Sequence, residues 1–100
     1  MSAEPWKPIL KLKNRKFVDY GKFAAAEYTR NYAPSNQYLE FKSVTQGGTR
    51  QVGSRFEVWL EIRATDRGDG GSVGLWRMNL YEEEGVKFFT NGRKLPDDYD

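Results

Sequence analysis

The sequence predicts an α+β domain, in which one α-helix packs across a twisted antiparallel β-sheet of four to five strands. Apolar residues recur at helical spacing between residues 20 and 28, and from Tyr38 onward they alternate with polar residues instead. The helix would have one apolar stripe and the sheet one apolar face, so each covers the other. We expect a single domain over residues 1–100, with an ordered core at 6–90 and flexible ends at 1–4 and 91–100.

The first element expected is an edge strand over residues 6–12. Trp6, Leu10 and Leu12 fall on one side of an alternating pattern. Pro5 and Pro8 cannot donate ladder hydrogen bonds, which predicts pairing only in the later half of this strand.

A helix is expected over residues 22–30, with Asp19 as its N-terminal cap. Alanines occupy its centre and favour the helical conformation. One face is expected to carry Tyr20, Phe23, Ala24, Glu27 and Tyr28. Residues 31–37 contain Pro34 and should end the helix.

Four further strands are predicted over residues 39–44, 56–64, 73–81 and 86–90. In the second of them, the side chains expected to face inward are Phe56, Val58, Leu60, Ile62 and Ala64. Trp59 should then lie on the face away from the helix, whereas the orientation of Trp76 stays open. Turns are expected at Gly47-Gly48 with Gly53, at residues 66–72 and at residues 82–85.

The amino-acid composition excludes several kinds of catalytic and metal-binding site. The chain contains neither cysteine nor histidine, which removes disulfides, thiolate nucleophiles, imidazole bases and nearly all zinc chemistry. No spacing singles out a pair of catalytic carboxylates. We therefore expect no enzyme, no cofactor and no metal site.

Sequence signals for export and membrane insertion are lacking as the chain is written. The first residues, Met-Ser-Ala-Glu-Pro, have no apolar core of a signal peptide, and no run approaches a membrane span. This predicts a cytoplasmic protein without a membrane partner. A secreted or vacuolar mature form, with its signal already removed, stays open.

The net charge is +2, and a basic cluster precedes the predicted helix. Its members are Lys7, Lys11, Lys13, Arg15 and Lys16. Aromatic residues are not interleaved among them as on a base-stacking surface, so a solvated strand and loop is favoured. Nucleic acid is therefore not expected as a partner.

Several segments resemble plant cystatins. Trp6-Lys7-Pro8-Ile9 is similar to the Trp-Lys-Pro-Ile of many members. The stretch 20–29 resembles the family's Leu-Ala-Arg-Phe-Ala-Val-x-Glu-His-Asn helix motif, with matches at Phe23, Ala24 and Glu27. Leu39-Glu40-Phe41-x-x-Val44 and Leu60-Glu61 are similar to the following strands. The similarity covers about residues 4–81, and it implies the cystatin/monellin fold.

The resemblance implies a reversible inhibitor of papain-like cysteine proteases, also called thiol protease inhibitors. In this family an N-terminal segment and two hairpin loops fill the protease cleft as a wedge. The protease-binding residues implied by position are Glu4, Pro5, Trp6, Thr49, Arg50, Gln51, Val52, Gly53, Glu82, Glu83 and Glu84.

The chain departs from the family pattern in all three binding segments. Glu4-Pro5 stands where the family has Gly-Gly, and Thr49 to Gly53 lacks the leading Gln of Gln-x-Val-x-Gly. The acidic run at Glu82 replaces Pro-Trp. Inhibition is therefore expected to be weak or shifted in specificity, and a non-inhibitory protein-binding module using the same edge stays open. A monomer is expected, with exchange of the first hairpin as a route to a dimer.

Overall fold

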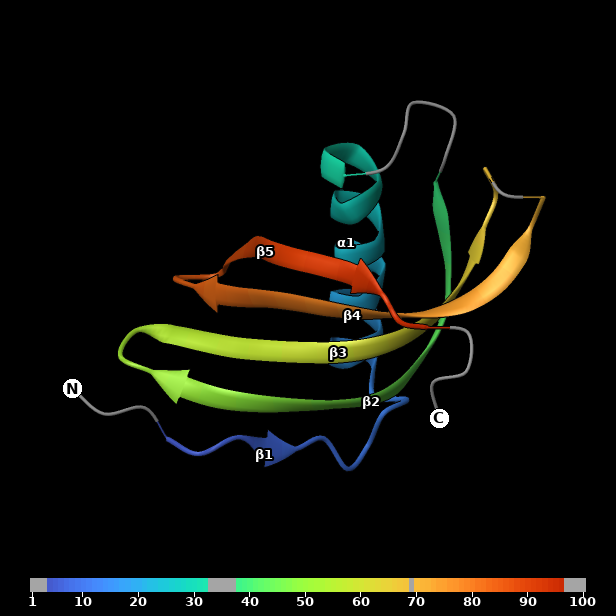
Figure 1. The fold of residues 1–100 in the computed structure, drawn as a ribbon. Coiled ribbons are helices and arrows are strands. Elements are labelled where there is room, and N and C mark those ends of the chain that lie inside the picture. Colours follow the sequence, from blue (N-terminus) through green and yellow to red (C-terminus); the bar gives the residue numbers. More distant parts are fainter. Residues whose placement is uncertain (1–3, 33–37, 69, 97–100) are drawn as a thin grey trace.

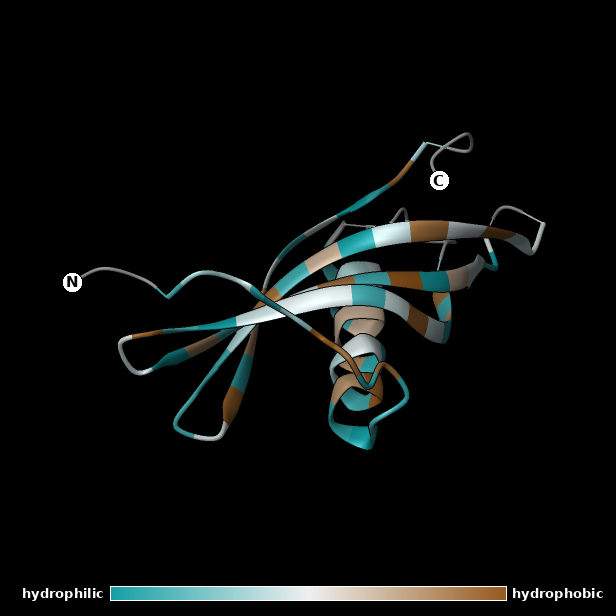
Figure 2. Ribbon diagram, turned by 90° about the horizontal axis from the view of Figure 1, so that it is seen from below, coloured by the Kyte–Doolittle hydropathy of each residue, from teal (hydrophilic) through white to brown (hydrophobic). Residues whose placement is uncertain are grey.

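The computed structural model describes residues 4–32, 38–68 and 70–96. Figure 1 shows the elements in chain order, which are β1 (Lys7–Pro8), α1 (Arg15–Tyr32), β2 (Leu39–Val52), β3 (Arg55–Asp66), β4 (Ser72–Glu83) and β5 (Val86–Lys94). The strands form one antiparallel sheet in the order β1-β2-β3-β4-β5. Helix α1 covers one face of this sheet (Figure 2). The α+β class predicted from the sequence is thereby confirmed.

The core lies between α1 and strands β2, β3 and β4. Strand β3 contributes Val58, Leu60, Ile62 and Ala64, all at most 1% exposed, while Phe56 is partly buried. The alternating pattern therefore identified the inward face of β3. Trp76 is also buried, which resolves an orientation that the sequence left open.

Strand β2 is longer than predicted, because it continues through the two glycines expected to form a turn. Gly47 pairs with Leu60, and Gly48 pairs with Trp59. A Cβ atom added to Gly47 would lie 2.6 Å from the backbone oxygen of Trp59. The glycines thus allow a close approach between neighbouring segments, which is a known role of glycine within a strand.

Helix α1 begins earlier than predicted, because Asn14 and not Asp19 caps it. The Oδ1 atom of Asn14 accepts a hydrogen bond from the Lys16 N–H at 2.9 Å, and its carbonyl accepts one from Val18 at 3.1 Å. Asp19 lies inside the helix, 3.9 Å from the Arg15 guanidinium. The added turn brings Phe17 against the core, and this packing stabilises the longer helix.

Replacing Asn14 with Ala should lower the free energy of unfolding by about 0.5–2 kcal/mol, because the first-turn N–H of Lys16 loses its acceptor. Asp19→Ala, the matched control, should cost about 0.5 kcal/mol or less, because its ion pair is exposed. Urea denaturation of both variants measures the difference. A larger loss for Asp19→Ala would contradict the capping role of Asn14.

The edge strand β1 pairs in a different part than predicted. Lys7 pairs with Thr49 and Pro8 with Gly48, while Ile9 donates to the Gly47 carbonyl at 3.0 Å. Alternation turns the Pro8 nitrogen away from β2, so the absent N–H costs no ladder bond. The later half leaves the sheet, and Leu10 is 87% exposed.

The ends of the other elements also differ from the predicted bounds. Strand β5 runs to Lys94, and Leu95 is buried with its N–H donating to Leu75 at 2.8 Å, so the polar tail begins later than residue 91. Strand β4 includes Glu82 and Glu83, which were expected in a turn. Helix α1 runs to Tyr32, so the prediction that the helix ends within residues 31–37 is wrong for residues 31 and 32. The rest of that segment, 33–37, and the tail at 97–100 lie outside the described residues.

Candidate protein-binding site

Three segments meet at one end of the sheet. In Figure 1, the N-terminal segment, the β2–β3 hairpin tip and the β4–β5 hairpin tip all lie at the left of the view. Segments far apart in sequence are thus assembled at a single narrow end by the antiparallel topology. This end carries the residues that the resemblance implied as protease contacts.

The β2–β3 tip is a two-residue turn at Gly53 and Ser54. Gly53 has a φ of 61°, a left-handed value that glycine adopts without steric cost. Thr49 to Val52, expected in a loop, instead belong to β2. The tip is stiffened by the Gln51 amide, which donates to the Gly53 carbonyl at 2.9 Å.

The β4–β5 tip is also a two-residue turn, formed by Glu84 and Gly85 with φ values of 53° and 79°. Two positive values match a type I′ turn, which suits the twist of a hairpin. Glu83 accepts a hydrogen bond from the Ser54 hydroxyl, and Glu82 accepts one from the Tyr20 hydroxyl. Two of the three carboxylates in the acidic run are therefore occupied inside the domain, and Glu84 is the exposed one at the tip.

Polar contacts tie the three segments together. The Glu4 carboxylate accepts from the Gln51 N–H at 3.3 Å, and the Glu4 N–H donates to the Gln51 carbonyl at 3.5 Å. The Arg55 guanidinium lies 3.9 Å from Glu83 on the neighbouring strand. The N-terminal segment is thus joined to the first hairpin, and the first hairpin to the second.

Four residues in register form the outermost row of the sheet at this end, and we call them the hairpin edge. Val52 pairs with Arg55, and Glu83 pairs with Val86. The central Arg55–Glu83 pair joins the two hairpins, and an apolar side chain lies on each side of it. Val86 is 52% exposed and Val52 partly so. The hairpin edge consequently presents apolar side chains on a rigid frame.

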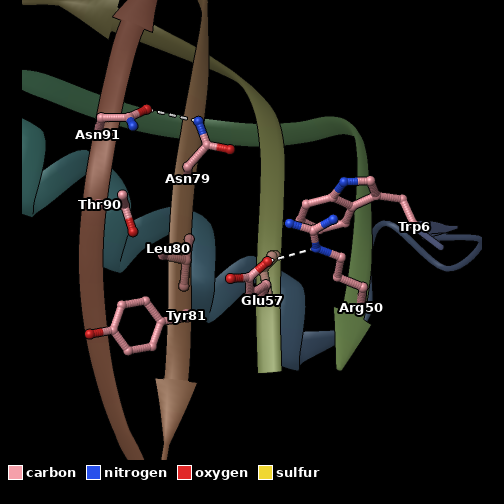
Figure 3. Close-up of a pocket in the computed structure, with 9 residues that line it drawn as sticks. Trp6, Arg50, Glu57, Asn79, Leu80, Tyr81, Thr90 and Asn91 are labelled. Atoms are coloured by element: carbon pink, nitrogen blue, oxygen red, sulfur yellow. Dashed lines mark hydrogen bonds and ion pairs between the residues drawn. The ribbon is translucent and has the colours of Figure 1, made fainter. Parts of the chain in front are cut away.

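Behind the hairpin edge lies a row of aromatic and charged side chains (Figure 3). The Trp6 ring has the Arg50 guanidinium 4.3 Å from its centroid, and Arg50 Nε donates to Glu57 at 2.7 Å. Tyr81 stacks on Phe88 with centroids 4.9 Å apart. A groove of about 320 Å³ runs between Trp6 and Tyr81. Trp6 therefore anchors the N-terminal segment to β2 while remaining 40% exposed.

The environment of Tyr20 shifts the pKa of its side chain. Its side chain is 1% exposed, and burial raises the pKa of its phenol, with a further increase from the hydrogen bond and the negative charge of Glu82. At the opposite end of the sheet, the hydrogen bond from Arg67 lowers the pKa of the Glu40 carboxyl.

Several residues of the site were missed by sequence reasoning. They are Ser54, Arg55, Tyr81, Val86 and Phe88. The Glu84-Gly85 dipeptide, placed between two alternating segments, was the signal for a two-residue hairpin. Applying it would have assigned Glu82 and Glu83 to β4 and Val86 to the outermost pair.

The arrangement provides apolar contacts and fixed charges, which are the means of binding a protein surface. Within the described residues, no group of acidic side chains is arranged to hold a metal ion. No helix in the described part of the chain has the length and apolar character needed to cross a membrane. No family model, curated protein or solved structure matches the chain significantly.

Proposed function

We propose that the protein is a reversible inhibitor of papain-like cysteine proteases, weak or shifted in specificity, that enters the active-site cleft as a wedge. One observation carries the proposal. The N-terminal segment and both hairpin tips lie at the same end of the sheet and are joined by the Glu4–Gln51 and Arg55–Glu83 contacts. The proposal also rests on the cystatin-like motifs of the sequence.

Rigidity favours such a mode of binding. Association loses free energy when flexible segments become ordered, and a preformed edge avoids much of that loss. Here both tips are two-residue turns, and their strands are held in register up to the last pair, Val52 with Arg55 and Glu83 with Val86. Val52 and Val86 supply apolar contacts for the cleft.

Charge at the tip affects which protease is inhibited. Glu84 is exposed at the second turn, where desolvation against a neutral or acidic surface would cost binding energy. A protease with basic residues at its cleft rim would pair with this carboxylate. We therefore expect inhibition to be strongest for proteases of that kind.

Titration against papain and a panel of plant and animal cathepsin-like proteases tests the proposal. Val52→Glu should raise the inhibition constant at least about tenfold, because it buries an unpaired charge in the cleft. Val73→Glu is the matched control, since Val73 is 58% exposed and lies at the opposite end of β4. It should leave inhibition unchanged.

Failure to inhibit any protease of the panel at micromolar concentration would refute the proposal. The same end would then serve a non-inhibitory protein-binding module. One observation favours that alternative, namely that the second tip presents the exposed Glu84 carboxylate, which is costly to desolvate in a cleft without basic residues.

A further inference from the structure

The sheet face opposite α1 carries a set of arginine, asparagine and tryptophan side chains that the wedge does not use. Side chains alternate along a strand, so the neighbours of the buried Leu60, Met78 and Leu80 point away from the helix. Figure 2 shows α1 on one side of the sheet only. The residues concerned are Trp59, Arg77, Asn79, Asn91 and Arg93, which we call the arginine face.

The arginine face holds two like charges directly opposite each other. Arg77 and Arg93 are register partners on β4 and β5, a placement that is destabilising in the absence of a counter-ion. Among the described residues, no carboxylate lies within ion-pair distance of either guanidinium. Positive charge is therefore concentrated here without neutralisation from the described part of the domain.

Glu61, which pairs with Arg77 across β3 and β4, does not neutralise this charge directly. Its carboxylate accepts hydrogen bonds from the Thr45 hydroxyl at 2.6 Å and from the Gln46 amide at 2.9 Å. Glu61 is only 6% exposed. The bonds of this carboxylate are thus directed toward β2 and not toward the two arginines.

An aromatic ring lies beside one of the two arginines. The Arg77 guanidinium lies 4.3 Å from the centroid of the Trp59 ring, and Trp59 in turn crosses Gly48 closely. Such stacking fixes the guanidinium plane and leaves its edge N–H groups to bind an anion. Asn79 and Asn91 bond to each other at 2.8 Å and line the adjoining groove of about 320 Å³ (Figure 3).

We infer that the arginine face binds single-stranded nucleic acid. Arginines recognise phosphates, exposed aromatic faces stack on unpaired bases, and amides can bond base edges. Trp6, which is 40% exposed, lines the groove, and Phe88, which is 42% exposed, stacks on the groove residue Tyr81 and extends the aromatic surface. A duplex fits less well, since its bases are already stacked on each other.

An acidic polypeptide is the competing ligand, because it would also neutralise the arginines. It lacks flat bases, so it could not stack on the ring faces that Arg77, Arg50 and Tyr81 leave uncovered. This difference makes nucleic acid the better match. The linear sequence gave no indication of it, because these side chains come from three strands and become neighbours only through the register.

Fluorescence anisotropy of a labelled oligothymidylate of about 12 nucleotides tests the inference on the full chain, within the site size of a single domain. Binding should occur at about 50 mM salt and weaken as salt rises. The double variant Arg77→Gln/Arg93→Gln should weaken it at least about tenfold and reduce the salt slope by about 1.4, at about 0.7 per lost phosphate contact.

The matched control is Lys11→Gln/Lys13→Gln, which removes the same charge from the exposed basic cluster before α1. It should change the affinity by less than about threefold, since its lysines lie outside the arginine face. Both double variants should keep wild-type circular dichroism. The arginine variant should also keep wild-type protease inhibition, because the hairpin edge is intact, so the two proposals can fail separately.

Three outcomes would overturn the inference. The first is no binding at about 20 mM salt with protein at about 100 µM, where nonspecific affinity is already measurable. The second is an equal loss in both double variants, which would indicate general charge attraction only. The third is displacement of the oligonucleotide by polyglutamate as efficiently as by unlabelled oligothymidylate, which would identify an acidic polypeptide as the ligand.

Discussion

Replacing Tyr20 with Phe should lower the free energy of unfolding by about 1–3 kcal/mol at neutral pH, because it leaves a carboxylate without its internal donor. Tyr20 is 1% exposed, and its hydroxyl donates to Glu82 across the interface of α1 and β4. Without the hydroxyl, the partly buried Glu82 side chain loses this hydrogen-bond donor. The loss should also loosen the second hairpin, since Glu82 lies two residues before its turn.

The phenol of Tyr20 should also make the free energy of unfolding depend on pH. Burial, and then the bond and charge of Glu82, raise the pKa of the folded Tyr20 phenol above the unfolded value of about 10. A raised pKa stabilises the fold fully below the unfolded value, and this contribution is lost as pH rises through the folded value. Above about pH 10, Tyr20 should therefore reduce stability by up to about 1.4 kcal/mol per pH unit.

Urea denaturation at about pH 7, 10 and 11 separates the two effects. Tyr20→Phe should be less stable at neutral pH, and it should lose less stability than the wild type above about pH 10. Tyr38→Phe is the matched control, because Tyr38 is 52% exposed and should change neither quantity. An unchanged alkaline slope in Tyr20→Phe would contradict the assigned environment of the phenol.

Patterns carried by one segment were predictable from the sequence. The inward face of β3 follows from alternation alone, since Val58, Leu60 and Ile62 are consecutive members of one period-two series. The helical stripe at Tyr20 and Ala24 is equally local. The start of the helix was not predictable in this way, because Asn14 and Asp19 are both good caps and the packing of Phe17 decides between them.

The candidate site was predictable only in part, for a similar reason. The two hairpins could be expected from their turn residues, which placed Gly53 and Glu84 near the tips. The contacts that join the segments could not be predicted. The Arg55–Glu83 and Glu4–Gln51 pairs form because of the pairing between strands, and the distance between these residues in the sequence does not indicate it. The arginine face is the extreme case, because Arg77 and Arg93 are separated by a whole hairpin in sequence and are directly opposite in space.

The sequence marks Gly47 as a residue with a special backbone role but does not show which role it is. Glycine suits both a turn and a close approach between strands, and only the partner segments distinguish the two roles. In the structure, a Cβ at Gly47 would lie 2.6 Å from the Trp59 carbonyl oxygen and 2.8 Å from Ile9 Cδ1. The carbonyl belongs to a paired central strand, so it cannot move without disturbing the β2–β3 ladder.

Gly47→Ala should therefore lower the free energy of unfolding by about 1–3 kcal/mol, the usual effect of overpacking. Gly48→Ala should cost less, because its added Cβ meets the Trp59 indole Nε1 at 2.5 Å and that partly exposed side chain can rotate. Urea denaturation monitored by tryptophan fluorescence tests both, since only Gly48→Ala should alter the native emission of Trp59 strongly. If Gly47→Ala were as stable as the wild type, the two glycines would lie in a turn and β2 would end near Val44, as local sequence alone indicates.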